Sequence, residues 1–81
     1  MTEEQIRRRI GEIVLMKRRR MGVTQEELAG RAGLRTSYIS DIERGRRNFS
    51  VITLLRLCSA LEEPPEALLD FPVGEISSDS V

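Results

Sequence analysis

The fold is decided by the stretch TQEELAGRAG, residues 24–33, together with YISDIERG, residues 38–45. In the first stretch, Thr24 and Glu27 have the spacing of a capping box, in which the two side chains satisfy free backbone N–H groups at the start of a helix. Gly33 then favours a tight turn, because glycine adopts the left-handed backbone conformation without a steric cost. We therefore expect a short helix that ends in a sharp change of direction.

The second stretch lies in a helix that we expect to begin near Thr36 and to end at Gly45. Its residues Ile39 and Ile42 lie three positions apart, a spacing that places them on one buried face. In the preceding helix, Ala29 is small enough to let two helices cross at close range. The pattern predicts a pair of crossed helices, with the polar face of the second helix turned outward.

Apolar residues at three- and four-residue steps predict further helices on both sides of this pair. These helices are expected over residues 3–21, 50–61 and 65–69. No stretch alternates in the way that is typical of a β-strand. The sequence thus predicts an all-α fold, a compact five-helix bundle formed by residues 1–71, followed by a flexible acidic tail over residues 72–81.

The composition argues against several classes of protein. A length of 81 residues accommodates one domain. The chain contains no His, and Cys58 is its single cysteine, which excludes an intrachain disulfide and a thiolate zinc site. We expect no enzymatic activity, no metal and no cofactor. The chain also lacks an apolar signal stretch or a run of membrane-spanning length, which predicts a cytoplasmic protein with no membrane partner.

The formal net charge of zero conceals an uneven distribution. Residues 1–56 carry all 13 Lys and Arg residues and seven acidic ones, a net charge of +6. Residues 57–81 carry six acidic residues and no basic one. A basic body with an acidic C-terminal part indicates a polyanion as the partner of one face. Mutual neutralisation of basic and acidic helices is the alternative, and charge alone leaves both open.

The two quoted stretches resemble the phage repressor/Cro-type helix-turn-helix family, also called the XRE family, over roughly residues 5–69. The resemblance implies that the helix starting at Thr36 is a recognition helix, which reads base edges in the major groove while the preceding helix crosses the DNA backbone. Residues 38–48 look most like the controller proteins of bacterial restriction–modification systems. Such proteins are dimers that bind tandem operators and regulate their own promoter.

The resemblance also implies individual DNA contacts. Base contacts are expected from the start and the outer face of the recognition helix, namely from Thr36, Ser37, Asp41 and Arg35. Backbone contacts are expected from the residues around that helix: Gln25, Tyr38, Arg44, Arg46, Arg47, Asn48 and Ser50. For Asp41 the alternative is an ion pair with Arg44 or Arg35, for Ser50 it is helix capping, and for Tyr38 it is packing.

Two charged residues are expected to be structural. Arg18 and Glu43 occupy positions that pair with each other in related phage repressors, so the resemblance implies a salt bridge between the first helix and the end of the recognition helix. The basic runs 7–9 and 17–20 are different, because consecutive helical residues point around the whole circumference. We interpret those runs as solvated surface rather than as a binding motif.

Apolar residues in excess of one small core predict a dimer interface on the last two helices. This interface is expected to contain Ile52, Leu55, Pro65, Leu68 and Phe71, with closure of the monomer core by the last helix as the alternative. The expected partners are double-stranded DNA, a second copy of the chain, a second dimer on a tandem operator, and RNA polymerase. A stand-alone phage-type or antitoxin-type repressor, and a protein-binding adaptor on the same fold, are the competing functions.

Overall fold

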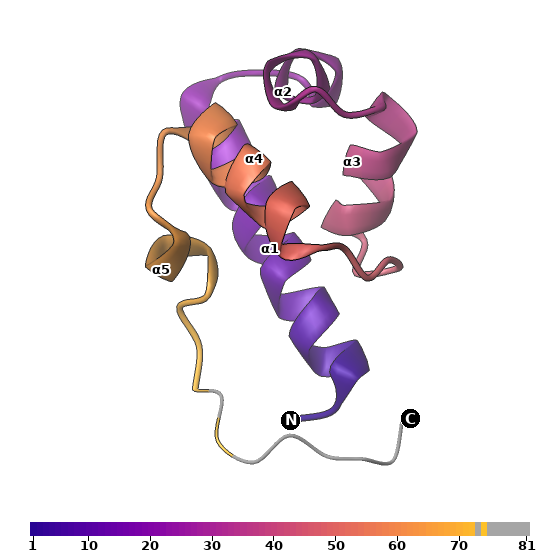
Figure 1. Ribbon diagram of the computed structural model, residues 1–81, viewed down its shortest axis with the longest axis vertical. Coiled ribbons are helices and arrows are strands. Elements are labelled where there is room, and N and C mark those ends of the chain that lie inside the picture. The colour runs from indigo at the N-terminus through magenta and orange to yellow at the C-terminus, as the bar shows by residue number, and fades with distance from the viewer. Residues whose placement is uncertain (73, 75–81) are drawn as a thin grey trace.

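The computed structural model describes residues 1–72 and 74. Its helices are α1 (Glu3–Met21), α2 (Gln25–Ala32), α3 (Thr36–Glu43), α4 (Val51–Leu61) and α5 (Pro65–Leu68), as Figure 1 shows. The described residues contain no strand, so the predicted all-α bundle is confirmed. The tail predicted over residues 72–81 lies outside the described residues, except for Pro72 and Gly74.

Two of the helices begin at a capping box. At the start of α2, the Thr24 Oγ1 atom accepts a hydrogen bond from the Glu27 backbone N–H, and the Glu27 carboxylate accepts one from the Thr24 backbone N–H, both at 3.0 Å. The latter bond keeps the pKa of the Glu27 carboxyl below its usual value. Thr2 and Gln5 form the same box at the start of α1. A cap of this kind typically stabilises a helix by about 1 kcal/mol.

α3 is shorter than predicted. It ends at Glu43 with Arg44 as its C-cap, whereas the sequence predicted that it extends to Gly45. Gly45 has a φ of 70°, and a Cβ atom at this position would lie 2.7 Å from the Arg8 Cα atom. The chain therefore leaves the helix and turns against α1, at a position where only glycine fits.

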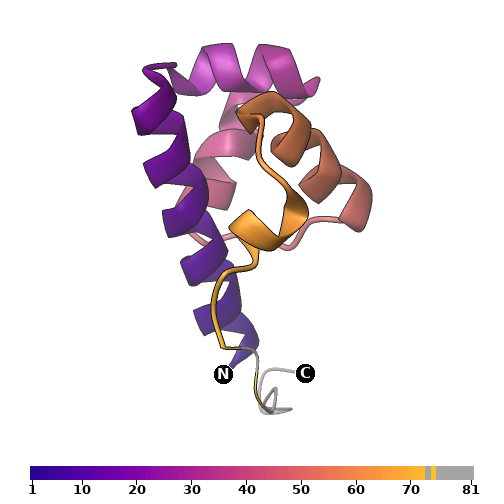
Figure 2. The same ribbon diagram turned by 90° about the vertical axis from the view of Figure 1, so that its left-hand side faces the viewer.

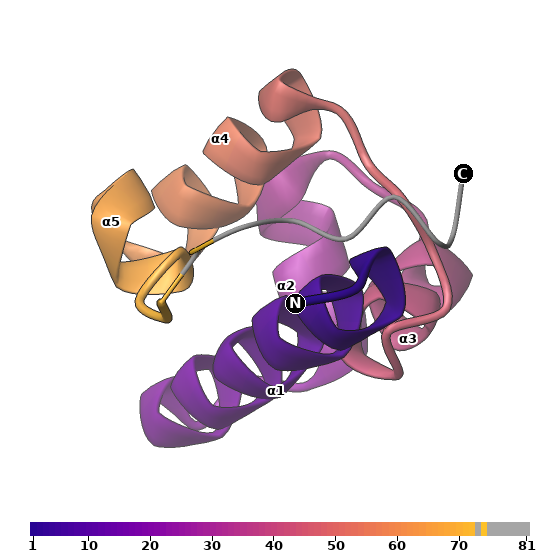
Figure 3. The same ribbon diagram turned by 90° about the horizontal axis from the view of Figure 1, so that it is seen from below.

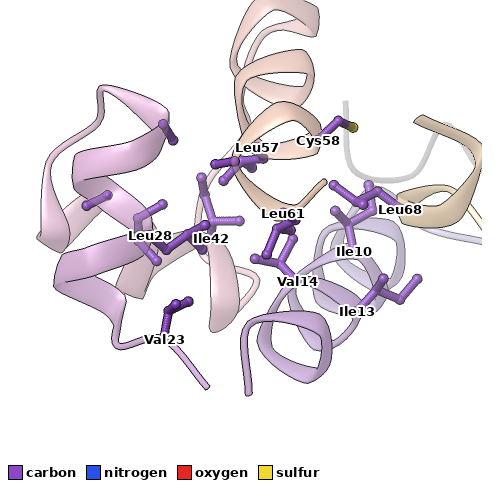
Figure 4. Packing of buried hydrophobic residues seen from close by; sticks show 14 residues of the cluster. Ile10, Ile13, Val14, Val23, Leu28, Ile42, Leu57, Cys58, Leu61 and Leu68 are labelled. Carbon is purple, nitrogen blue, oxygen red and sulfur yellow. The ribbon is translucent and has the colours of Figure 1, made fainter. Parts of the chain in front are cut away.

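The core is almost entirely aliphatic, and Figure 4 shows side chains from all parts of the bundle pointing into it. It consists of Ile10, Ile13, Val14, Val23, Leu28, Ala29, Ala32, Ile39, Ile42, Leu57, Cys58, Ala60, Leu61 and Leu68. Burial of each large aliphatic side chain contributes roughly 1.5–3 kcal/mol. Burial also raises the pKa of the Cys58 thiol, which therefore behaves as a small apolar group.

The arrangement of the helices leaves one side of α3 uncovered. α1 packs against α3, α4 and α5, while α2 packs against α3 and α4. In Figure 1, α3 and α5 lie at opposite sides of the molecule, and Figure 2 shows α5 resting against α1 and α4. Viewed from below, in Figure 3, the chain that follows α3 runs along the edge of the molecule to α4. None of the helices among residues 1–72 combines the length and apolar character that a membrane crossing requires.

One glycine brings α1 and α3 unusually close. A Cβ atom on Gly11 would lie 2.3 Å from the Ile42 carbonyl oxygen and 2.8 Å from that of Glu43. Both oxygens belong to the last turn of α3. The backbone of α1 thus rests directly on the C-terminal end of α3, and this contact helps to fix the direction in which α3 points.

Candidate DNA-binding surface

The first turn of α3 presents short polar side chains to solvent. Thr36 and Ser37 are exposed, and so is Arg35, the N-cap residue, whose side chain makes no capping hydrogen bond. On the opposite face of the same helix, Ile39 and Ile42 are fully buried. The helix is therefore anchored on one side, and its start is free to meet a partner on the other.

A buried network fastens the far end of α3. Arg18 Nε and Nη2 donate to the two carboxylate oxygens of Glu43, at 2.6 and 3.1 Å, so the predicted ion pair is present. Arg18 Nη1 also donates to the Val23 carbonyl oxygen at 3.0 Å. The two charged side chains are only 12 % and 3 % exposed. The network joins α1, the loop after it and the end of α3 into one rigid unit.

Gln25 takes part in the same network. Its Nε2 atom donates to Glu43 Oε1 at 2.8 Å, and the residue is half-buried at the first position of α2. The sequence predicted a phosphate contact for Gln25, and this contact stays a prediction. The side-chain NH2 group carries a second hydrogen, which is the one that a phosphate oxygen would accept. Glu43 therefore holds the amide of Gln25 in a defined position at the start of α2.

A basic, exposed segment follows the recognition helix. Arg44, Arg46, Arg47 and Asn48 are all exposed to solvent. Ser50, by contrast, uses its hydroxyl oxygen to accept from the Thr53 backbone N–H at 3.1 Å. That bond caps α4 and matches the alternative interpretation of Ser50 rather than a free phosphate ligand.

Asp41 and Tyr38, both on α3, lie next to a residue of this segment. Arg47 Nη1 lies 3.6 Å from Asp41 Oδ2, and its guanidinium carbon lies 4.7 Å from the centre of the Tyr38 ring. The sequence offered Arg44 or Arg35 as the ion-pair partner of Asp41, and that expectation was wrong. The reason is the turn at Gly45, which brings the following residues back alongside the helix.

The structure corrects one member of the predicted dimer interface. Leu68 has no exposed surface and packs in the core of its own chain, so it cannot contact a partner. The sequence could not tell Leu68 from Leu69, which is exposed, because α5 is a single turn and has too few residues to establish a periodicity. Phe71 is half-buried against the core, and Pro65 is exposed.

The apolar surface that remains exposed is concentrated on α4. Ile52 and Leu55 are 61 % and 44 % exposed, as a contact with a partner would require. Val51, which the sequence reasoning missed, is 69 % exposed. Its position one helical turn before Leu55 was the available signal, since residues four apart share a face.

Several residues of the two basic runs form ion pairs with acidic residues of the same chain. Arg8 pairs with Glu4 at 2.6 Å, and Lys17 pairs with Glu63 at 3.2 Å, which links α1 to the chain just before α5. Arg19 and Arg20 point into solvent. The interpretation of the runs as a solvated face therefore holds for Arg8, Arg19 and Arg20, but not for Lys17 and Arg18, whose side chains are only 15 % and 12 % exposed.

α2 and α3 are joined by a tight turn, α3 has an exposed polar face, and a basic loop follows it. This is the arrangement of a helix-turn-helix. The chain belongs to the helix-turn-helix family of DNA-binding transcriptional regulators, whose model matches residues 15–68. This match covers α2, α3, α4 and α5 entirely, together with the end of α1.

Two curated proteins illustrate the similarity. The uncharacterized HTH-type transcriptional regulator y4dJ of Sinorhizobium fredii is 46 % identical over 56 residues, which are 69 % of this chain and 73 % of that protein. The control protein C.BamHI of Bacillus amyloliquefaciens is 47 % identical over 49 residues, 60 % of each chain. The matched part thus spans less than two thirds of C.BamHI.

Solved structures show the same fold. The restriction–modification controller protein C.AhdI of Aeromonas hydrophila is 37 % identical, with a TM-score of 0.75 over 76 % of this chain and 94 % of that one. The clp gene regulator ClgR of Corynebacterium glutamicum is 32 % identical, with a TM-score of 0.76 over 80 % of this chain and 84 % of that one. Both similarities extend over most of the helical domain.

Proposed function

We propose that this protein is a sequence-specific regulator of the controller-protein type, which binds a palindromic operator as a homodimer. The observation that carries the proposal is the exposed start of α3, where Arg35, Thr36 and Ser37 project from a helix whose other face is buried. An α-helix fits the major groove, in which each base pair presents a distinct set of donors, acceptors and methyl groups. Thr36 and Ser37 are the residues to which we assign base contacts.

Phosphate contacts on both sides of α3 set the depth and the direction of this helix in the groove. Arg44, Arg46 and Asn48 supply exposed donors after the helix. Gln25 supplies an amide at the start of α2, where free backbone N–H groups also favour an anion. Contacts of this kind position the protein on any duplex and add affinity without sequence preference.

Dimerisation follows from the small size of the reading surface. One recognition helix reads only a few base pairs, whereas two copies on half-sites about 10 base pairs apart double the contacts. The exposed apolar side chains of Val51, Ile52 and Leu55 provide a surface on α4 for a second copy. A two-fold dimer requires a palindromic operator, since each half-site meets the same helix.

The controller role within a restriction–modification system is supported by the similarity to C.BamHI and C.AhdI. In that role the protein regulates its own promoter, with two dimers on tandem operators and with RNA polymerase as a further partner. A stand-alone regulator is the second candidate, since y4dJ, which is 46 % identical, is described only as an HTH-type transcriptional regulator. Neighbouring genes separate the two, because adjacent endonuclease and methyltransferase genes are expected only for a controller.

In vitro selection tests the proposal. The full-length chain is used to select ligands from a library of random duplexes, and the selected duplex is compared with a scrambled one by fluorescence anisotropy. The proposal predicts a palindromic consensus that binds at least about 10³-fold more tightly than the scrambled duplex. Equal affinity for both duplexes would contradict sequence-specific binding, and a consensus without symmetry would contradict the dimer.

A further inference from the structure

The chain doubles back on itself directly after α3. The Arg46 backbone N–H donates to the Asp41 carbonyl oxygen at 2.9 Å, and Gly45 occupies the left-handed conformation between them. A side chain at Gly45 would collide with the backbone of Arg8 on α1, so the path of this turn is fixed by contact with a second helix. Arg47 is therefore returned to the side of α3 by the backbone itself.

The side chain of Arg47 lies over the outer face of α3. Its Nη1 atom is 3.6 Å from Asp41 Oδ2, and its guanidinium carbon lies 4.7 Å from the centre of the Tyr38 ring. Tyr38 and Asp41 are three positions apart, so they share one face of the helix. One cation is thus held between an aromatic ring and a carboxylate on the helix that we assign to the major groove.

This cluster contributes little to the stability of the fold. The Arg47 and Asp41 side chains are 52 % and 38 % exposed, and exposed ion pairs of this kind contribute almost nothing to folding. The buried pair of Arg18 and Glu43 differs, because it is enclosed and bonded through two oxygens. The contacts of Arg47 with Asp41 and Tyr38 therefore orient its guanidinium rather than stabilise the fold.

The negative charge of Asp41 is unfavourable on a helix that binds DNA. A carboxylate on the recognition helix faces the phosphates of the duplex, which repel it. Arg47 neutralises this charge in the structure. The planar guanidinium fork of arginine matches the O6 and N7 acceptors of guanine, and this pair is the commonest specific contact in the major groove. A carboxylate that holds the fork in place prepares it for such a contact.

We propose that Arg47 is a specificity-determining residue that reads a guanine, and that Asp41 and Tyr38 are positioning residues that orient its guanidinium over α3. The proposal rests on the proposed function. It assigns a base contact to Arg47, for which the sequence predicted a backbone contact. It also gives Asp41 a supporting role in place of a direct contact with a cytosine.

The test uses the full-length chain, the selected operator and a scrambled duplex in fluorescence anisotropy titrations. Arg47→Lys keeps the charge but removes the fork, so we expect a roughly tenfold or larger loss on the operator and little change on the scrambled duplex. Arg20→Lys, at an exposed position on α1, is the matched control and should behave as the wild type. Thermal unfolding of each variant verifies that the fold is intact.

Asp41→Ala gives the sharpest distinction. Loss of a negative charge should strengthen binding to both duplexes if Asp41 only repels phosphate. We expect the opposite on the operator, a loss of several-fold, because Arg47 is no longer oriented. The double variant Asp41→Ala/Arg47→Ala should bind the operator no worse than Arg47→Ala alone. A cytosine preference that survives in Arg47→Ala would instead show that Asp41 reads the base itself, and would overturn the proposal.

The Tyr38 ring is tested with a matched pair of variants. Tyr38→Phe keeps the ring and should retain operator affinity, whereas Tyr38→Ala should lose several-fold. Equal losses in the two variants would contradict the role of the ring, because the hydroxyl group would then make the contact. If Arg47→Lys matches the wild type on a selected operator, the inference about Arg47 fails alone. If no operator can be selected, the proposed function fails and this inference fails with it.

Discussion

Arg18 and Glu43 lie 25 positions apart in the sequence, yet two hydrogen bonds of 2.6 and 3.1 Å join their side chains inside the domain. The pair connects the last turn of α1, the longest helix, to the last residue of α3. Gln25, at the start of α2, also donates a hydrogen bond to the Glu43 carboxylate. The relative positions of α2 and α3, on which binding to DNA depends, are thus set by one carboxylate.

Removal of this carboxylate should destabilise the protein strongly. Glu43→Ala leaves the guanidinium of Arg18 buried without its charged partner, with the Val23 carbonyl oxygen as its remaining acceptor, and we expect a loss of about 3–5 kcal/mol in the free energy of unfolding. Urea denaturation followed by circular dichroism measures this loss. Glu12→Ala, which removes an exposed carboxylate from α1, is the control and should cost under about 1 kcal/mol. A similarly small loss for Glu43→Ala would show that the network is not structural.

Two glycines inside helices should respond in opposite ways to the same substitution. Gly30→Ala on α2 adds a methyl group into open space and should stabilise the protein by about 0.5–1 kcal/mol, because alanine favours the helix. Gly11→Ala on α1 forces a methyl group against carbonyl oxygens of α3 and should cost about 1–3 kcal/mol. The melting temperatures of the two variants provide the comparison. Stabilisation by Gly11→Ala would contradict the close approach of α1 and α3.

Removal of a phosphate ligand should alter the salt dependence of binding. Arg46→Ala is expected to weaken binding to operator and scrambled duplexes alike, and to reduce the slope of log K against log salt by about 0.9 for each phosphate that is no longer neutralised. Arg19→Ala, an exposed arginine on α1, is the control and should leave the slope unchanged. An unaltered slope in Arg46→Ala would exclude this residue as a phosphate ligand.

A charge placed on the exposed apolar surface of α4 should separate the proposed dimer. Leu55→Glu introduces a carboxylate into the surface formed with Val51 and Ile52, and burial of an unpaired charge is costly. Sedimentation should then give the mass of one chain, 9.2 kDa. Met16→Glu changes another exposed apolar residue, on α1, and should leave the dimer intact. A dimer that persists in Leu55→Glu would place the interface elsewhere.

The sequence predicted best those features that depend on neighbouring residues. The capping box of Thr24 and Glu27, and the buried pair of Ile39 and Ile42, follow from spacings of three positions along one helix. The ion pair between Arg18 and Glu43 spans a greater distance, and it was expected only from the resemblance to phage repressors.

Features that depend on contacts between distant segments could not be predicted. The end of α3 at Glu43 and the return of Arg47 along the helix both follow from the contact of Gly45 with Arg8, two residues 37 positions apart. The burial of Leu68 depends in the same way on how α5 docks on α1 and α4. Sequence periodicity carries no information about such a docking.

The central claim is that the start of α3 reads base edges. The direct measurement is the affinity of the double variant Thr36→Ala/Ser37→Ala for the selected operator and for the scrambled duplex, each compared with the wild type. We expect weaker binding to the operator alone, by roughly 1–3 kcal/mol for each base edge that is no longer read, with the affinity for the scrambled duplex retained. Equal losses on both duplexes, or no loss on either, would contradict it.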